Sequence, residues 1–478
     1  MNLFTRKPYT HDEHSGLQRK LGPIDLILLG IGAVIGAGLF AVTPTAAHQN
    51  AGPSVVLSFV LVGIGCTLAG MCYSEFATMI PLAGSAYTYA YSTMGELLAW
   101  IIGWDLVLEY AVGAATLSVS WSNYLVRLLG HFGISVPRAI VAGPFEGGVV
   151  NLPAIFITCL VSCVLIAGIR SSARFNGIIV VVKVAIVLLV VFLGWGFINH
   201  ANHVPFLPPN QGEFGHFGWS GMMRAAGVVF FAYIGFDAVS TAAQEARNPQ
   251  KDMPVGMIGS LLACTVLYIL FAWVLTGILN YKEMTSTAIY DALNKIGHPG
   301  LATLVVVGIL FGYTSVILVM LFGQSRIFFS MSRDGLLPKV FSQVHPRFGT
   351  PWRSNLILMS FCSLFSGFVP LSSLSNMTSI GTLLAFLIVC AGVMIMRRTD
   401  PHLPRPYRTP WVPFVPVMGM ITCFSFMAVL DRATWIRMVV WLVVGLIVYF
   451  SWSRHHSLLA QSAIKYQAIR GPELLVED

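Results

Sequence analysis

Long apolar stretches separated by short polar segments run along almost the whole chain. A helix needs about 20 mostly apolar residues to cross the hydrocarbon core of a membrane, and it must satisfy its backbone polar groups internally. Twelve stretches meet this requirement, at about 24–47, 53–79, 97–126, 152–170, 175–199, 221–243, 255–280, 300–330, 353–371, 374–396, 411–430 and 435–452. The pattern predicts an all-α polytopic membrane protein with twelve transmembrane helices.

The composition supports lipid as the solvent of most of the chain. Hydrophobic residues make up 56% and charged residues 10% of the 478 residues, and the mean hydropathy is +0.76. Residues 1–23 are polar and lack the apolar core of a removable signal peptide, so we expect cytoplasmic segments at 1–23 and 453–478. The connections are too short to fold separately, and any function must therefore lie between the helices.

Positive charges predict the orientation, because Lys and Arg near span ends are retained on the cytoplasmic side. With both termini inside, 20 of the 28 Lys and Arg residues fall on the inner side. The net charge of +8 is spread over short loops without a basic face, so it suits anionic lipid headgroups better than nucleic acid. We expect a protein of the inner or plasma membrane with no nucleic-acid partner.

Residue patterns typical of enzymes and metal sites are missing. All eight cysteines lie in predicted spans, with no CxxC motif and no histidine at metal-ligand spacing. The chain has no HExxH and no GxSxG motif, and its spans have no cluster of histidine with carboxylates. We therefore expect no disulfide, no metal, no cofactor and no enzymatic activity.

Glycines interrupt two of the predicted spans near the middle of the membrane. The first span contains GIGAVIGAGLF (Gly30 to Phe40), and the sixth contains FFAYIGFDAVST (Phe230 to Thr241). Because they lie five spans apart, the two run in opposite directions. Paired interruptions of this kind are typical of inverted repeats whose broken helices meet at a central binding site. A single glycine in a span more often serves close helix packing, so the matched pair carries this prediction.

Three ionisable side chains lie deep in predicted spans, where a charge costs about 2.5–3.5 kcal/mol on insertion scales. Lys183 is in the fifth span, Glu109 follows Asp105 by one turn in the third, and Asp237 follows the glycine of the sixth. Burial disfavours the charged form of a lysine, which makes Lys183 a candidate proton carrier, unless its long stem reaches the membrane surface. Glu109 and Asp237 either couple protons directly or form a static hydrogen-bonded pair.

Five ordered motifs carry a family resemblance. They are GIGAVIGAGLF, PLAGSAYTYAY (Pro81 to Tyr91), GWDLVLEYA (Gly103 to Ala111), FFAYIGFDAVSTAAQEARNP (Phe230 to Pro249) and GQSRIFFSMSRDGLLP (Gly323 to Pro338). Together they resemble the amino acid–polyamine–organocation superfamily, and within it the cationic amino acid transporter branch and its bacterial relatives. The similarity extends from about Leu21 to Ser453.

The resemblance implies a LeuT-type fold and amino acid transport. Residues 24–199 and 221–396 would form inverted repeats of five helices each, with discontinuous first and sixth helices, and 411–452 would form two accessory helices. The backbone that would hold the substrate carboxylate lies at Gly36, Ala37 and Gly38. The carbonyls that would hold its ammonium belong to Val34, Phe231, Ala232 and Ile234, and Phe231 would also be an aromatic lid.

The resemblance also bears on coupling and substrate. Lys183 matches a lysine of proton-coupled members that occupies the place of sodium in sodium-driven relatives, which favours coupling to H+. Ala37 stands where many relatives have Ser or Thr, so a hydroxyl contact to the carboxylate is missing. Met320 falls where members that carry cationic substrates have a small polar residue, and it would fill the room that a long cationic side chain needs.

The leading hypothesis is proton-coupled symport of a free neutral L-amino acid by alternating access. An exchanger or a permease for cationic amino acids would share the same motifs. A non-transporting amino acid sensor would keep the binding residues but signal through its tails, which are short here. We expect a monomer in contact with membrane lipid, and a small single-span accessory subunit is an open alternative.

Overall fold

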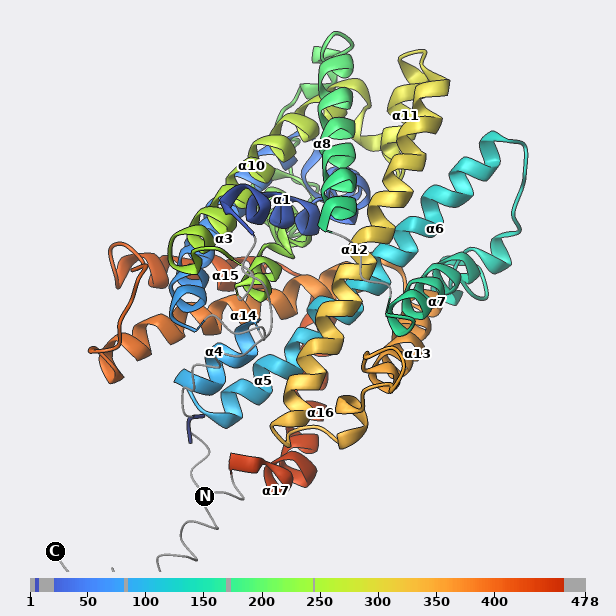
Figure 1. Ribbon diagram of the computed structural model, residues 1–478. Helices are drawn as coiled ribbons and strands as arrows, with labels where there is room; N and C mark the ends of the chain where they lie inside the picture. The colour runs from blue at the N-terminus through green and yellow to red at the C-terminus, as the bar shows by residue number, and fades with distance from the viewer. Residues whose placement is uncertain (1–4, 8–20, 81–84, 169–172, 244–245, 460–478) are drawn as a thin grey trace, which may run out of the picture.

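Helices connected by loops make up the computed structural model (Figure 1), which describes residues 5–7, 21–80, 85–168, 173–243 and 246–459. In these residues the extended pairings are two isolated β-bridges, Leu21 with Ala246 and Val141 with Asn151. The rest of both terminal segments, part of the second and fourth motifs, and residues 169–172 lie outside the described residues.

The connection 196–217 separates two series of helical segments, in which η marks a 3-10 or π segment. Besides the segments given for each series, five short ones lie in connections: η5 (Arg138–Ile140), η6 (Pro144–Glu146), η7 (His200–His203), η10 (Tyr281–Glu283) and η11 (Lys339–Ser342). The first series is α1 (Pro23–Val34), η1 (Gly38–Val42), α2 (Thr43–Ala46), η2 (Ala47–Ala51), η3 (Gly52–Ser54), α3 (Val55–Met79), α4 (Ser85–Thr93), α5 (Glu96–Val107), η4 (Leu108–Val112), α6 (Gly113–His131), α7 (Leu152–Ile166) and α8 (Ala173–Trp195). The second series is α9 (Gly218–Val229), η8 (Phe230–Tyr233), η9 (Phe236–Ala242), α10 (Pro249–Ile278), α11 (Ala288–Lys295), α12 (Pro299–Arg333), α13 (Trp352–Phe368), α14 (Leu371–Thr399), α15 (Phe414–Ala428), α16 (Arg432–Val448), η12 (Tyr449–Ser453) and α17 (Arg454–His456).

Each of the twelve predicted stretches contains all or most of at least one of these α-helices. Within the described residues, eight helical runs are long and apolar enough to cross a membrane, and α1, α7 and α15 are shorter apolar helices. The chain is thus a multi-pass helical membrane protein, whereas the count of twelve spans and the inverted repeats stay predictions. Two short helices that hydropathy did not predict, α4 and α11, lie in the connections.

Small residues let α10 pack closely along α1, and α10 also packs along α3 (Figure 1). A Cβ atom at Gly30 would lie 2.6 Å from the Ser260 Cβ, and one at Gly256 would lie 2.6 Å from the Leu26 Cβ. These two glycines therefore serve helix packing, which is the common role of glycine in membrane helices. Gly30 belongs to the first glycine-rich motif, so only part of that motif serves the helix break.

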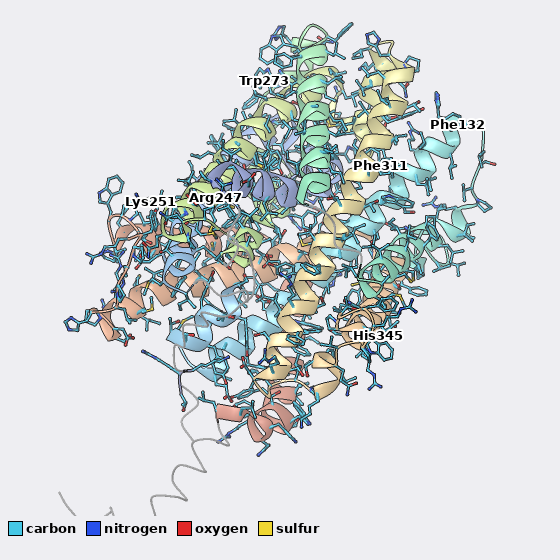
Figure 2. All side chains as sticks on the ribbon, in the orientation of Figure 1. Phe132, Arg247, Lys251, Trp273, Phe311 and His345 are labelled. Atoms are coloured by element: carbon cyan, nitrogen blue, oxygen red, sulfur yellow. The ribbon has the colours of Figure 1, made fainter. Side chains whose placement is uncertain are left out.

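Apolar side chains cover the outer surface of the helices. Phe311 on α12 is 64% exposed and projects from the helix surface (Figure 2). Such a side chain is unfavourable in water and suits contact with lipid tails.

The long connection before α9 is tied to the end of the first predicted span through Asn50. The Asn50 side-chain amide donates to the Gly215 carbonyl at 2.9 Å, and the Phe217 N–H donates to the Asn50 carbonyl at 2.8 Å. These two hydrogen bonds hold the connection against η2.

A buried charge cluster joins α3 to the segment that follows α14. Glu75 is fully buried and accepts hydrogen bonds from Arg397 Nη2 at 2.7 Å and from the Thr409 N–H at 2.8 Å. Arg405, with a side chain only 4% exposed, places its Nε 3.4 Å from Glu75 Oε1. Because two cations face one buried carboxylate, the cluster depends on the charge of Glu75.

We expect Glu75→Gln to lower the free energy of unfolding by about 3–5 kcal/mol, because it leaves two arginines without their buried anion. Thermal unfolding in detergent should show a clear fall in melting temperature. Arg6→Ala is the control: the Arg6–Asp400 pair has side chains that are both 35% exposed, and such pairs contribute about 1 kcal/mol or less. Equal effects of the two substitutions would contradict the prediction.

Candidate functional site

Both glycine-interrupted segments are broken helices. After α1 ends at Val34, Ile35 adopts φ −73° and ψ 102°, and helical structure resumes at η1. In the sixth predicted span, Ile234 adopts φ −62° and ψ 136°, and Gly235 adopts φ 110°, which separates η8 from η9. The positive φ of Gly235 is a conformation that side chains with a Cβ disfavour. The predicted breaks are therefore present in both segments.

The two breaks lie against each other, and glycines allow the approach. A Cβ at Gly38 would lie 2.7 Å from the Ala232 backbone nitrogen, which is too close for any side chain. A Cβ at Gly235 would lie 3.0 Å from the Ala33 carbonyl oxygen. Each break thus presents a glycine to the backbone of the other.

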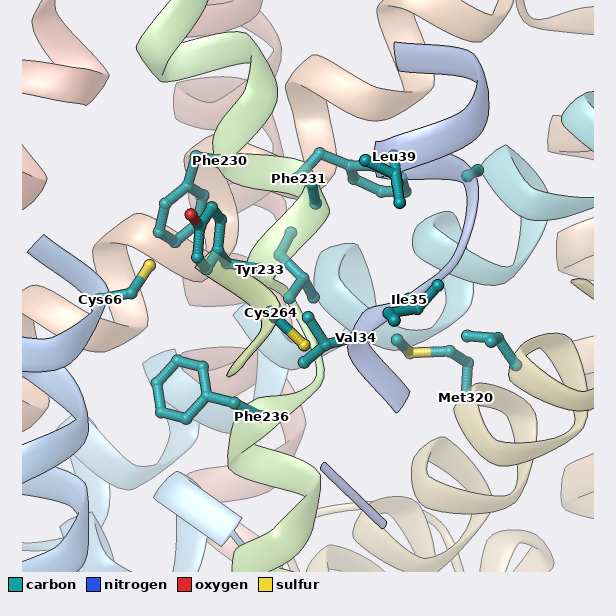
Figure 3. Close-up of a cluster of buried hydrophobic side chains, with 14 of the residues drawn as sticks. Val34, Ile35, Leu39, Cys66, Phe230, Phe231, Tyr233, Phe236, Cys264 and Met320 are labelled. Carbon is teal, nitrogen blue, oxygen red and sulfur yellow. The ribbon is translucent and has the colours of Figure 1, made fainter. Parts of the chain in front are cut away.

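A small cavity of about 10 Å³ lies at this junction. Such a space holds about one water molecule, so the site is contracted in this conformation. Figure 3 shows Val34, Phe231 and Met320 around the two interrupted segments. The lining residues are Ala33, Val34, Gly36, Ala37, Gly38, Glu109, Gly113, Leu117, Phe231, Ile234, Val316 and Met320.

The structure brings most of the predicted binding residues together. Seven of the eight line the cavity, and the eighth, Ala232, lies behind Gly38 without lining it. Sequence reasoning missed Ala33, Gly113, Leu117 and Val316, although helical spacing offered a signal for three of them. Val316 precedes Met320 by four residues, and Gly113 and Leu117 follow Glu109 by four and eight, so they share helix faces with predicted site residues.

The cavity wall is apolar apart from main-chain groups and one carboxyl group. Glu109 is the single ionisable residue among those that line it. The wall therefore suits an aliphatic group, and main-chain polar groups are available where the helices break.

Lys183 lies at the end of α1 and not at the membrane surface. Its side chain is 1% exposed, and Nζ donates a hydrogen bond of 2.9 Å to the Gly32 carbonyl. The last carbonyls of a helix lack partners within the helix and carry its partial negative charge. In this structure the lysine stem does not extend toward solvent. The amine instead supports the carbonyl end of the first broken helix.

Glu109 and Asp237 form a buried carboxyl pair next to the cavity. They are 1% and 0% exposed, and their side chains interact directly. Asp237 Oδ2 accepts from Tyr110 Oη at 2.9 Å and from Ser85 Oγ at 3.2 Å. Within the described residues, Asp237 Oδ1 and both Glu109 oxygens have no donor at normal hydrogen-bond geometry. Two facing acceptors need a proton between them, so this pair can hold one.

We expect Gly38→Ala to cost about 1–3 kcal/mol of stability, because the new methyl group must displace the Ala232 backbone. A lower melting temperature in detergent would be the readout. The control is Gly177→Ala in α8, where an added Cβ meets nothing within 4 Å and removal of a helical glycine gains about 0.5–1 kcal/mol. A Gly38 variant as stable as the Gly177 variant would contradict the close approach.

The chain is similar to known transporters over almost its whole length. The family model described as "Amino acid permease" matches residues 21–450. A "Methylthioribose transporter" of Bacillus subtilis is 42% identical over 465 residues, which cover 96% of this chain and 99% of that protein. The "Branched-chain amino acid permease BcaP" of the same organism is 41% identical over 453 residues, which cover 93% and 95%.

A plant protein extends the comparison to the cationic branch. "Cationic amino acid transporter 9, chloroplastic" of Arabidopsis thaliana is 37% identical over 421 residues, which cover 86% of this chain and 72% of the plant protein. The predicted superfamily is therefore confirmed, and it is a family of transporters and not of enzymes. The chain belongs to the amino acid permease family of the amino acid–polyamine–organocation superfamily, alongside cationic amino acid transporters and their bacterial relatives.

Proposed function

We propose that the protein is a secondary active transporter that carries neutral amino acids with protons by alternating access. The observation that carries this proposal is the meeting of two broken helices at one cavity, with the main chain of both lining it. Free main-chain groups of opposite polarity suit the two charged ends of a zwitterion.

Each end of the substrate has proposed partners at the breaks. The carboxylate would be held by the backbone at Gly36, Ala37 and Gly38, where the helix resumes and N–H groups lack partners within it. The ammonium would be held by carbonyls of Val34, Phe231, Ala232 and Ile234. Phe231, which is buried and lines the cavity, would act as the aromatic lid.

The side chain of the substrate would face the aliphatic wall. Leu117, Val316 and Met320 supply apolar contact, and none of them can pair with a cationic group. This wall supports neutral amino acids, a reading that also agrees with the relative named as a branched-chain permease. Methylthioribose is a second candidate, because one relative is named for it. Among the side chains that line the cavity, Glu109 is the one ionisable group that could form a hydrogen bond with its hydroxyl groups.

Proton coupling would use two separate groups near the breaks. Lys183 donates one hydrogen bond, to the Gly32 carbonyl. A charged ammonium is a stronger donor than a neutral amine, so loss of a proton would weaken this bond. The Glu109–Asp237 pair would hold a second exchangeable proton beside the cavity. Both groups touch a broken helix or the cavity, so proton state would bias the opening of the site. The proposal needs no cofactor beyond the coupling ion.

The proposal includes a complete architecture. It has twelve spans in a LeuT-type fold, repeats at 24–199 and 221–396, accessory helices at 411–452, and both termini in the cytoplasm. The α-helices at all twelve positions and the two breaks in the first and sixth support it. The protein would act as a monomer in contact with lipid. A complex with a small single-span accessory subunit is the alternative.

Lys183→Ala should abolish uptake of alanine driven by an imposed pH gradient in proteoliposomes, while some amino acid binding persists. Lys295→Ala is the matched control, because Lys295 Nζ also donates to a helix-terminal carbonyl, that of Ile278 at 3.0 Å, but lies away from the cavity. Gradient-driven accumulation by the Lys183 variant equal to that of the unaltered protein would show that the coupling role is wrong. Counterflow without net accumulation in the unaltered protein would identify an exchanger.

Met320→Ser should allow arginine to bind, because it removes the side chain that fills the apolar wall. A thermal-shift screen of the twenty amino acids and methylthioribose, on both the unaltered protein and the variant, is the measurement. We expect neutral amino acids to stabilise the unaltered protein and arginine to stabilise only the variant. Stabilisation of the unaltered protein by arginine or lysine would overturn the neutral preference.

A further inference from the structure

One tyrosine hydroxyl connects the two broken helices. Tyr268 on α10 is fully buried, and its Oη lies 3.0 Å from the Val34 carbonyl oxygen and 2.9 Å from the Ala232 carbonyl oxygen. Val34 is the last residue of α1, and Ala232 lies in η8, directly before the second break. The hydroxyl therefore contacts one carbonyl of each break.

The Tyr268 hydroxyl can donate fewer hydrogen bonds than the Val34 and Ala232 carbonyls can accept. A phenol has one O–H, so one proton serves two carbonyl acceptors. Each carbonyl has two lone pairs, and a buried acceptor without a donor costs about 1–3 kcal/mol. These two carbonyls are also among the four proposed to receive the substrate ammonium, which brings three donors. The Tyr268 hydroxyl and the substrate ammonium would thus donate to the same two carbonyls.

Packing fixes the direction of the hydroxyl. The Tyr268 ring lies 5.4 Å from the ring of Phe59 and 5.4 Å from that of Tyr233, centroid to centroid. Tyr233 is itself held by a hydrogen bond of 3.1 Å from its hydroxyl to the Phe59 carbonyl. Because α10 packs along both α1 and α3, the helix that carries Tyr268 is held in place beside the breaks.

In this conformation the space between the breaks is about 10 Å³, far less than an amino acid fills. The carbonyls at the breaks therefore need a donor from the protein while the site is contracted. We infer that the Tyr268 hydroxyl takes the place of the substrate ammonium and allows the substrate-free carrier to close and return. Tyr268 is then a positioning residue that separates net transport from exchange, an inference that rests on the proposed transport function.

The inference predicts a split between two assays. Net uptake requires the empty carrier to return across the membrane, whereas exchange of internal for external substrate does not. Tyr268→Phe removes the donor and keeps the ring. We expect net uptake of labelled alanine or leucine under a pH gradient to fall about tenfold or more, the effect of one lost buried hydrogen bond. Counterflow in liposomes preloaded with the same amino acid should stay within about twofold.

Tyr313→Phe is the matched control. Tyr313 is also a fully buried tyrosine, and its hydroxyl has no hydrogen-bond partner within the described residues. Removal of such a hydroxyl should change neither assay. Should the Tyr268→Phe protein not be recovered folded, Tyr268→Leu, which also lacks the donor, should show the same split.

Three results would overturn the inference. Net uptake and counterflow that fall together would show a structural role alone, and unchanged net uptake would show that the hydroxyl is not needed for return. If the unaltered protein shows neither net uptake nor counterflow of alanine or leucine, the proposed function is wrong, and the inference fails with it. The unaltered protein thus reports on the proposed function, and the Tyr268 variant reports on the inference.

Discussion

A backbone polar group that leaves a helix inside a membrane must find another partner, because lipid offers none. This constraint governs the centre of the protein, where two helices stop and restart. Side chains from neighbouring helices meet part of the demand: Lys183 donates to the Gly32 carbonyl, and Tyr268 donates to the Val34 and Ala232 carbonyls. A bound zwitterion would supply partners for the remaining main-chain groups. The same groups would then serve both substrate binding and the stability of the fold.

Close packing makes this arrangement sensitive to small displacements. Gly38 and Gly235 bring each break against the backbone of the other, and the cavity between them contracts to about 10 Å³. In the proposed mechanism a substrate enters when the two breaks separate, and separation would divide the two carbonyl contacts of Tyr268. In this mechanism these buried contacts would link three events: the opening of the site, the binding of substrate and the exchange of protons at the Glu109–Asp237 pair.

Much of this architecture can be predicted from the chain, and the remainder depends on contacts between helices. Hydropathy predicts the helical segments, and the glycine motifs predict the breaks around Gly36 and Gly235. Tyr268, which sequence reasoning missed, contacts the breaks only because of how α10 is rotated about its axis. Helices that are apolar on all sides carry no periodicity that reports this rotation. The short helices α4 and α11 fall below the length that hydropathy detects.

In the proposed binding mode, main-chain groups at the two breaks hold both charged ends of a zwitterion. Titration calorimetry on the purified protein tests it most directly, with leucine compared with 3-methylbutylamine, which lacks the carboxylate, and 4-methylpentanoate, which lacks the ammonium. The account predicts that leucine binds and that neither analogue does. Binding of either analogue with an affinity equal to that of leucine would contradict it.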